Sequence, residues 1–196
     1  MHTLLIALSG VWIAVIAIVV LILWFVSLYN GLVRLKNIAE GAWAQIDVQL
    51  KRRHDLIPNL IATAKGYMAH EKGTLEAVIS ARNAAVSATQ DPKAGPAAVA
   101  GAENMLTGVL RQFFALSEAY PDLKANTNML QVQEELSSTE NRIAFSRQHY
   151  NDSVRRYNTK LQVIPTNIVK NFGDFPEKEF FELEDPEQRE APKVEF

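Results

Sequence analysis

Cysteine is absent from the 196 residues of the sequence. This excludes a disulfide-stabilised scaffold, a thiolate zinc site, an iron-sulfur cluster and a cysteine nucleophile. The length suffices for one domain with accessory segments, because two domains of half this size would each have a small core. The formal net charge is -2, and the basic cluster from Lys51 to His54 is short, so nucleic-acid binding is not expected.

Several catalytic and ligand-binding motifs are also missing. The stretch from Gly95 to Gly101 lacks the Lys-Ser/Thr pair of a phosphate-binding loop, and the chain has no Gly-x-Ser-x-Gly elbow. The pair His70-Glu71 begins like a zinc-protease helix motif, but Thr74 stands where the second histidine is required. We therefore expect no catalytic residue, no metal, no cofactor and no small-molecule substrate, and thus no enzyme.

Charge is absent from the 26 residues between Leu4 and Tyr29. As a helix this run would be about 39 Å long, against about 30 Å of hydrocarbon in a bilayer. No Lys or Arg precedes it, it exceeds the apolar region of a signal peptide, and no small-x-small cleavage site follows. We predict a retained, single-pass transmembrane anchor over residues 1–29.

The flanks of the anchor predict its orientation. Trp24 and Tyr29 lie where interfacial aromatic residues belong, and the first cations, Arg34 and Lys36, follow the span. By the positive-inside rule the rest of the chain is placed in the cytoplasm. Because only two cations lie close to the membrane, a periplasmic body remains the alternative.

Residues 30–175 show the three- and four-residue spacing of apolar side chains that is typical of helices, and no strand-like alternation. We predict an all-α body. The first helix continues from the anchor to about Met68 with a kink at Pro58, and a shorter helix then runs from Leu75 to the Asp91-Pro92 boundary. Further helices are expected over 103–119 and 127–164, with a connector at 92–101.

The segment from Asp122 to Ile164 contains neither Gly nor Pro and carries a heptad seam of the coiled-coil type. A helix of this length needs a partner along its whole length. Four helices joined by three connections predict an up-down-up-down bundle, in which the last helix lies antiparallel to the first.

The composition changes after Pro176, where eight acidic residues stand against three basic ones. We expect residues 176–196 to form an acidic, disordered tail. The alternative is that Phe180 to Leu183 docks on a groove as a short linear motif.

Charged residues interrupt the seam of the last helix at Glu140 and Arg147. If Leu32 lies level with Ile164, facing residues of the two long helices have numbers that sum to 196, which places Glu140 within a turn of Arg52 and Arg53. Buried polar layers more often fix helix register than perform chemistry. We predict a Glu140 contact with Arg53 or Arg52 that acts as a register device, with a catalytic dyad as the alternative.

Several strings in the chain resemble the LemA family of bacterial membrane proteins over about residues 30–172. The strings run from Val48 to Leu60, Lys65 to Tyr67, Tyr120 to Asn126 and Leu136 to Ala144, with Tyr150-Asn151 and Tyr157-Asn158 beyond them. The resemblance implies a single-pass protein with a long-helix bundle, no established enzymatic activity, and an association with membrane-bound zinc proteases and envelope maintenance. It also implies recurring polar or kink positions at Arg53, Asp55, Pro58, Glu140 and Asn141.

Together these features predict a non-enzymatic scaffold in the bacterial inner membrane that presents a helical bundle to protein partners or to copies of itself. The alternative is a membrane-anchored sensor that binds a small molecule or a metal through the polar layer. The predicted layer comprises Arg52, Arg53, Asp55, Pro58, Glu140, Asn141 and Arg147, and the sensor reading adds His54 or His149.

Overall fold

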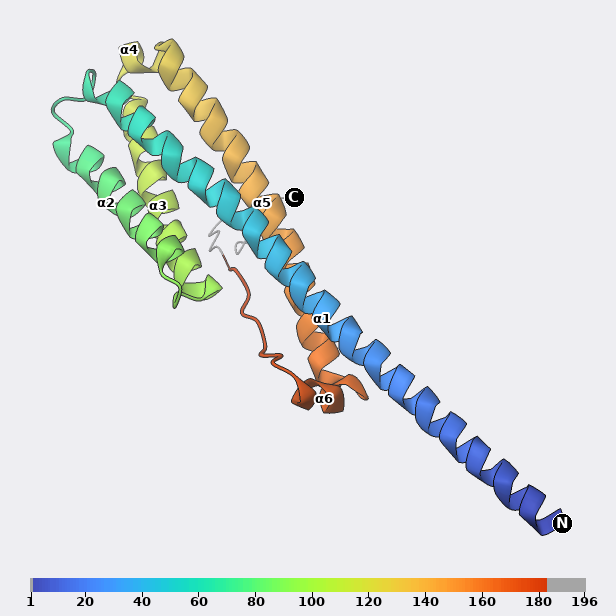
Figure 1. The fold of residues 1–196 in the computed structure, drawn as a ribbon. Helices are drawn as coiled ribbons and strands as arrows, with labels where there is room; N and C mark the ends of the chain where they lie inside the picture. The colour runs from blue at the N-terminus through green and yellow to red at the C-terminus, as the bar shows by residue number, and fades with distance from the viewer. Residues whose placement is uncertain (1, 183–196) are drawn as a thin grey trace, which may run out of the picture. The chain divides into compact units, whose positions relative to one another are not determined.

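The computed structural model describes residues 2–182, with side chains described from Gly10 onward. This part of the chain is helical and contains no strand, which confirms the predicted all-α class (Figure 1). The elements in chain order are α1 (His2–Lys65), α2 (Lys72–Gln90), α3 (Pro96–Ser117), α4 (Pro121–Lys124), α5 (Thr127–Gln162), α6 (Thr166–Val169) and the 3-10 helix η1 (Lys170–Phe172).

Helix α1 is unbroken from His2 to Lys65, as the sequence predicts for an anchor that continues into the body. Within the described residues it is the one helix long and apolar enough to cross a membrane, with a mean hydropathy of 3.0 in its most apolar window. The large apolar side chains from Val11 to Trp24 are 44% to 67% exposed. Such exposure is typical of a helix that faces lipid. The helix continues through Pro58, where the kink stays a prediction.

The start of α3 differs from the prediction. Helix α2 ends at Gln90, next to the predicted boundary, but α3 already begins at Pro96. The predicted connector at 92–101 is therefore wrong from residue 96 onward. Proline suits the first helical turn because it lacks only an N–H that has no partner there, and the alanines that follow favour a helix.

The ends of α5 have local causes. At the start, Asn126 Oδ1 accepts the N–H groups of Asn128 at 2.9 Å and Met129 at 3.2 Å, and so caps the helix. At the other end α5 stops at Gln162, two residues before the predicted Ile164. A residue that precedes proline is disfavoured in the helical conformation, and Pro165 follows Ile164.

The chain divides into two compact units. Of the described residues, the first unit comprises 2–41 and 152–178, and the second comprises 42–151 and 179–182, so α1 and α5 each contribute to both. The core of the first unit is formed by Leu32, Tyr157, Leu161 and Val169, with Phe25, Leu28, Tyr29, Leu35 and Phe175 packed against it.

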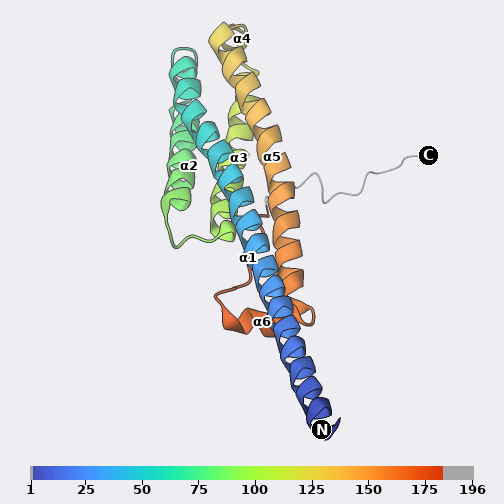
Figure 2. The same ribbon diagram turned by 45° about the vertical axis from the view of Figure 1, so that its right-hand side comes forward.

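The core of the second unit takes side chains from α1, α2, α3, α4 and α5. Helices α2 and α3 lie side by side along their length (Figure 2). The buried members are Ile57, Leu60, Ala64, Met68, Leu75, Val78, Ala81, Ala85, Leu106, Leu110, Phe113, Leu123, Met129, Val132 and Leu136.

Within the second unit, the segments of α1 and α5 run antiparallel in a constant register. Two contacts between these helices join residues whose numbers sum to 193, namely Trp43 with Tyr150 and Arg53 with Glu140. Just outside the helices, the hydrogen bond between Asn126, before α5, and Tyr67, after α1, has the same sum. The predicted sum of 196 is therefore wrong by three residues. The prediction placed Leu32 level with Ile164, whereas in the first unit Leu32 packs in one cluster with Leu161. The bundle order along the full chain stays a prediction.

Residues 176–182 form an extended segment whose backbone is hydrogen-bonded to two asparagines of α5. In the first unit, the Asn158 amide donates to the Lys178 carbonyl at 2.8 Å and accepts the Lys178 N–H at 3.0 Å. In the second unit, Asn151 makes the same pair of bonds to Phe181, at 3.1 Å and 2.9 Å. The predicted disorder is therefore wrong for residues 176–182, because these bonds and the burial of Phe181 offset the cost of ordering the segment. The rest of the predicted tail, 183–196, lies outside the described residues.

The tyrosine that precedes each asparagine also holds the segment. Tyr157 donates its hydroxyl to the Pro176 carbonyl at 3.0 Å, and Tyr150 donates to the Glu179 carbonyl at 2.8 Å. Burial, with the nearby Glu179 carboxylate, raises the pKa of Tyr150 to about 12. Burial also raises the pKa of Tyr157. Phe181 is fully buried, and its ring lies 5.5 Å from that of Trp43. At this residue the segment is therefore docked, as in the alternative prediction for the stretch that begins at Phe180.

Candidate functional site

Five side chains of the second unit form a polar layer, which we call the Arg53 layer. They are Arg53 and His54 of α1, Glu103 and Thr107 of α3, and Glu140 of α5. Glu103 and Thr107 share a face of α3 because they are four residues apart. The exposed fraction is 2% for Arg53, 4% for His54 and 0% for Glu103. The layer therefore places charged groups where they need partners.

Arg53 is the centre of the layer. Its Nη1 atom lies 3.1 Å from Glu140 Oε2 and 3.5 Å from Glu103 Oε2, and its Nη2 atom donates to Thr107 Oγ1 at 2.6 Å. The Glu140 contact is the one that the sequence predicts. The ion pair with Glu103 is buried at both ends, whereas the Glu140 side chain is 47% exposed. Glu140 is thus less buried than its seam position predicts, and Glu103 is the principal counter-charge.

His54 is hydrogen-bonded within the layer. Its Nε2 atom lies 2.6 Å from Glu103 Oε1. Glu103 therefore bridges two consecutive residues of α1, with one oxygen facing the imidazole and the other facing the guanidinium of Arg53. A carboxylate shared in this way couples the rotation of α1 to that of α3 at one point.

Pro58 gives the layer a further contact through the backbone. Proline has no N–H, so the carbonyl of residue 54, four positions earlier, has no helical donor. Arg82 of α2 supplies one, since its Nε atom donates to the His54 carbonyl at 3.2 Å. The interruption of the α1 hydrogen-bond ladder thereby becomes a link between α1 and α2.

A cavity of about 340 Å³ adjoins the layer. Two guanidinium groups, those of Arg53 and Arg111, line it together with apolar side chains. Arg53 Nη1 and Glu103 Oε2 are both buried and make no hydrogen bond of good geometry, although they take part in ion pairs. The remaining lining residues are Thr107, Leu110, Phe114, Gln133, Leu136, Ser137 and Glu140.

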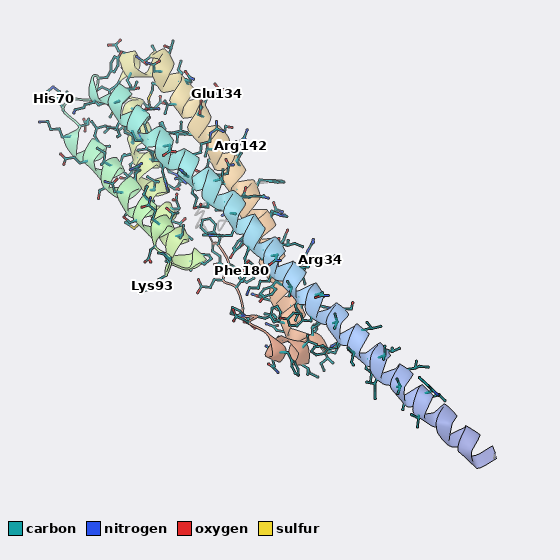
Figure 3. All side chains as sticks on the ribbon, viewed as in Figure 1. Arg34, His70, Lys93, Glu134, Arg142 and Phe180 are labelled. Atoms are coloured by element: carbon teal, nitrogen blue, oxygen red, sulfur yellow. The ribbon has the colours of Figure 1, made fainter. Side chains whose placement is uncertain are left out.

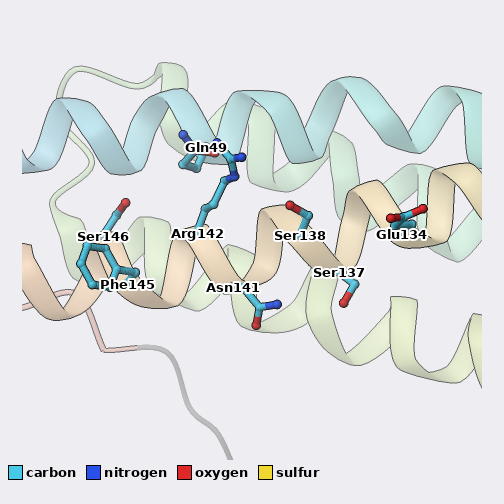
Figure 4. A pocket seen from close by; sticks show the side chains of 8 residues that line it. All are labelled: Gln49, Glu134, Ser137, Ser138, Asn141, Arg142, Phe145 and Ser146. Atoms are coloured by element: carbon cyan, nitrogen blue, oxygen red, sulfur yellow. The ribbon is translucent and has the colours of Figure 1, made fainter.

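A second, more open groove of about 600 Å³ lies between α1 and α5 of the same unit. Arg142 extends from α5 toward Gln49 on α1, and Phe145 and Ser146 lie at one end (Figure 4). Phe145 is 76% exposed. The other lining residues are Glu134, Ser137, Ser138 and Asn141.

The remaining predicted layer residues lie elsewhere. Arg52 contacts Glu135 at 3.3 Å at the surface, so it is not the partner of Glu140. Asp55, Pro58 and Asn141 are exposed, and Arg147 is half-buried. Positions 55 and 58 face away from the α1 surface that carries Arg53 because they are two and five residues further along the helix.

The sequence analysis did not identify Glu103 and Arg82 as site residues, although the pattern around each indicates a polar residue on an apolar helix face. Glu103 stands at helical spacing with the buried Val99, Leu106 and Leu110. A charge on the apolar face of a helix is the same signal that identified Glu140. Arg82 similarly interrupts the apolar spacing of α2.

The predicted interface residues belong to the first unit. Trp24 is 53% exposed, and Arg34 projects from α1 (Figure 3). Tyr29 stacks edge-on against Phe175 at 5.3 Å, and Lys36 Nζ donates to the Asp174 carbonyl at 2.9 Å. Tyr29 and Lys36 thus contact the segment that follows η1.

The chemistry available to the Arg53 layer is ion pairing and anion recognition. Within residues 2–182, no group of three or more His, Asp or Glu side chains is arranged to hold a metal ion. Every polar member of the layer contacts another member, as expected for a device that aligns helices.

Comparison with known proteins gives one family match. The model of the LemA family matches residues 42–196. Protein LemA of Metamycoplasma hominis is 29% identical over 145 residues, which are 74% of this chain and 64% of that protein, so the chain spans less than two thirds of this relative. Magnetosome protein MamQ of Magnetospirillum gryphiswaldense is 23% identical over 190 residues, and MamQ 2 of Paramagnetospirillum magneticum is 22% identical over 191 residues. These alignments cover 86% and 87% of this chain, and 70% of each relative.

Proposed function

The chain belongs to the LemA family, and from this premise we propose that it is a non-enzymatic, membrane-anchored scaffold that presents helices to protein partners, including copies of itself. The single observation that carries the proposal is the Arg53 layer. Its charged side chains form ion pairs that join α1, α3 and α5, and these pairs would hold the helices in register.

The constant register of α1 and α5 in the second unit supports this role. Contacts with the same register recur from Trp43 to Tyr67. An antiparallel pair of helices locked at several points is stiff. A stiff pair fixed to a membrane sets the position and orientation of whatever binds it.

An exposed surface supports contact with another protein. Phe145 is 76% exposed and Val48 is 62% exposed, and each lies at a groove that includes Gln49 and Ser146. Large apolar side chains beside a groove are typical of interaction surfaces. Because the groove also carries Arg142 and Glu134, it offers charges of both signs to a second copy.

Mass measurement tests the scaffold. The full chain, extracted from native membranes in mild detergent, is expected to carry at least one further polypeptide or copy. Phe145→Ala is expected to lower the mass of the complex, since the change removes the exposed ring. Leu130→Ala, at another exposed apolar position of α5, is the matched control and should leave the mass unchanged. A bare monomer in every preparation would contradict the scaffold.

The location and partners follow as part of the same proposal. We place the anchor in the bacterial inner membrane and the body in the cytoplasm, because Arg34 and Lys36 follow the span. A membrane-bound zinc protease and a role in envelope maintenance are the partner and process that the family resemblance implies.

The cavity beside the Arg53 layer favours a second candidate, an anion sensor. Its volume of about 340 Å³ lies in the range of small-molecule sites, and two arginines line it. Its ligand would be a small carboxylate or phosphate, the groups that a guanidinium recognises best.

Two variants together distinguish the candidates. A scaffold is expected to lose assembly in Glu140→Ala, because the register contact to Arg53 is gone, with a loss of stability of about 1 kcal/mol or less. A sensor is expected to keep its assembly in Glu140→Ala, whereas in Arg111→Ala, which removes an arginine from the cavity, the rise in melting temperature on addition of inorganic phosphate or succinate disappears. If the unmodified chain gains no thermal stability from either anion, the sensor is contradicted.

A further inference from the structure

We propose that the segment from Val163 to Phe172, which follows α5 and includes α6 and η1, forms a second membrane contact, inserted at the boundary between lipid headgroups and acyl chains. The inference rests on the proposed anchoring by α1 and goes beyond it, because the anchor alone does not determine what else touches lipid. The contact residues are Val163, Ile164, Ile168 and Phe172, which we call the apolar patch.

The side chains of the apolar patch are exposed although the segment is well packed. The exposed fraction is 42% for Val163, 80% for Ile164, 58% for Ile168 and 67% for Phe172. The segment already buries its inner side, since Thr166 is 0% and Val169 is 3% exposed. A segment with a buried face and an apolar outer face has a partner for the outer face, because such a patch is unfavourable in water.

The position of the apolar patch identifies this partner as lipid. Within the first unit, the Phe172 ring lies edge-on to Phe25 of α1 at 5.2 Å. The apolar run that ends at Tyr29 exceeds the thickness of the hydrocarbon core by about 9 Å, which is about six residues. Residues from about Trp24 onward therefore lie at the headgroup boundary, and Phe172 lies beside them.

The neighbouring charges suit an interfacial segment. Lys170 stands between Ile168 and Phe172 in the sequence, and Arg34 is exposed on α1 of the same unit. Cationic heads remain among the phosphates while apolar side chains insert below them. A second copy or a soluble partner would have to displace lipid from this surface, so the bilayer is the occupant that the position favours.

Single-cysteine labelling tests the contact, because the chain has no cysteine of its own. Ile168→Cys and Phe172→Cys variants of the full chain carry an environment-sensitive fluorophore and are reconstituted in phosphatidylcholine and phosphatidylglycerol vesicles. Some of the lipids carry a nitroxide near the headgroup. The matched control is Leu130→Cys, an exposed apolar position of α5 that lies 32 residues, or about 48 Å, before the end of the helix. Trp24→Cys, at the headgroup boundary of the anchor, is the positive control.

The expected result is a blue-shifted, several-fold quenched emission at positions 168 and 172 and unchanged emission at 130. Quenching at 24 but not at 168 and 172 overturns the second contact and leaves the anchor standing. Absence of quenching at 24 overturns the anchor itself. Equal quenching at 130 shows unselective adsorption and overturns the proposal. If the labelled variant at position 172 shows no lipid quenching and the unlabelled Phe172→Cys variant forms a disulfide between copies on addition of a mild oxidant, the apolar patch contacts a second copy, which also overturns the proposal. Far-UV circular dichroism of each variant verifies its helical fold.

Discussion

At the scale of single residues, burial decides which charges matter. Glu103 and Glu140 both contact Arg53, but the Glu103 side chain is 0% exposed and the Glu140 side chain is 47% exposed. Water screens the second ion pair, whereas the first loses hydration at both ends and depends on its partners.

The two carboxylates are therefore expected to differ in their effect on stability. Glu103→Ala should lower the free energy of unfolding by about 3–5 kcal/mol, because Arg53 is then left buried without its main counter-charge. Glu140→Ala should cost about 1 kcal/mol or less. Denaturant unfolding of both variants in the same detergent measures the difference. Equal losses would contradict the assignment of Glu103 as the principal counter-charge.

Tyr150 predicts an alkaline limit of stability. Its pKa is raised from the ordinary value of 10.0 to about 12, first by burial and then by Glu179. The folded state therefore binds the hydroxyl proton more tightly than the unfolded state. The contribution of Tyr150 is fully present below pH 10 and is lost as the pH rises from 10 to about 12.

Comparison of unfolding free energies at about pH 8 and about pH 11 measures this effect. The unmodified chain should lose more stability over this interval than Tyr150→Phe, which has no proton to release. The same loss in Tyr150→Phe would show that the hydroxyl contributes nothing to the pH dependence.

At the scale of elements, one helix compensates for a defect in another. Pro58 leaves the His54 carbonyl without a helical donor, and Arg82 donates to it at 3.2 Å. Arg82→Ala should cost about 1–3 kcal/mol, since a buried carbonyl then loses its donor.

A double-mutant cycle isolates this contact. In a Pro58→Ala background, residue 58 again has an N–H for the carbonyl, so Arg82→Ala should cost clearly less there than in the unmodified chain. Lys72→Ala, at another cation of α2, is the control and should cost the same in both backgrounds. Additive effects of Pro58→Ala and Arg82→Ala would contradict the compensation.

The elements also show which structural features can be predicted from sequence patterns and which cannot. The long helices were predictable because each carries its own apolar spacing and its own terminators, such as Pro165 after α5. The start of α3 was not, because Gly101 suggested a break although Pro96 and the alanines after it favour a helix. The docked segment 176–182 was predicted as disordered because its acidic composition does not reveal the asparagines of α5 that bind its backbone.

At the scale of the whole molecule, the remaining prediction concerns the side of the membrane. Lys93 is exposed in the connection between α2 and α3 (Figure 3). If the body lies in the cytoplasm, as we propose from Arg34 and Lys36, Lys93→Cys in intact cells should not react with a membrane-impermeant maleimide until the membrane is opened. His2→Cys, before the span, should show the opposite pattern. Labelling of Lys93→Cys in intact cells would establish the periplasmic alternative.

The sequence by itself determined the all-helical class, the long apolar helix near the N-terminus, the long α5 and a contact of Glu140 with Arg53 or Arg52. These features depend on periodicity, length and charge along a single helix, or on two helices in a nearly correct register. The tertiary structure alone decided that Glu103 bridges Arg53 and His54, that the register sum is 193, and that Phe181 is buried. His54 and Glu103 are 49 residues apart, so their contact depends on how helices pack against each other, which no local pattern encodes.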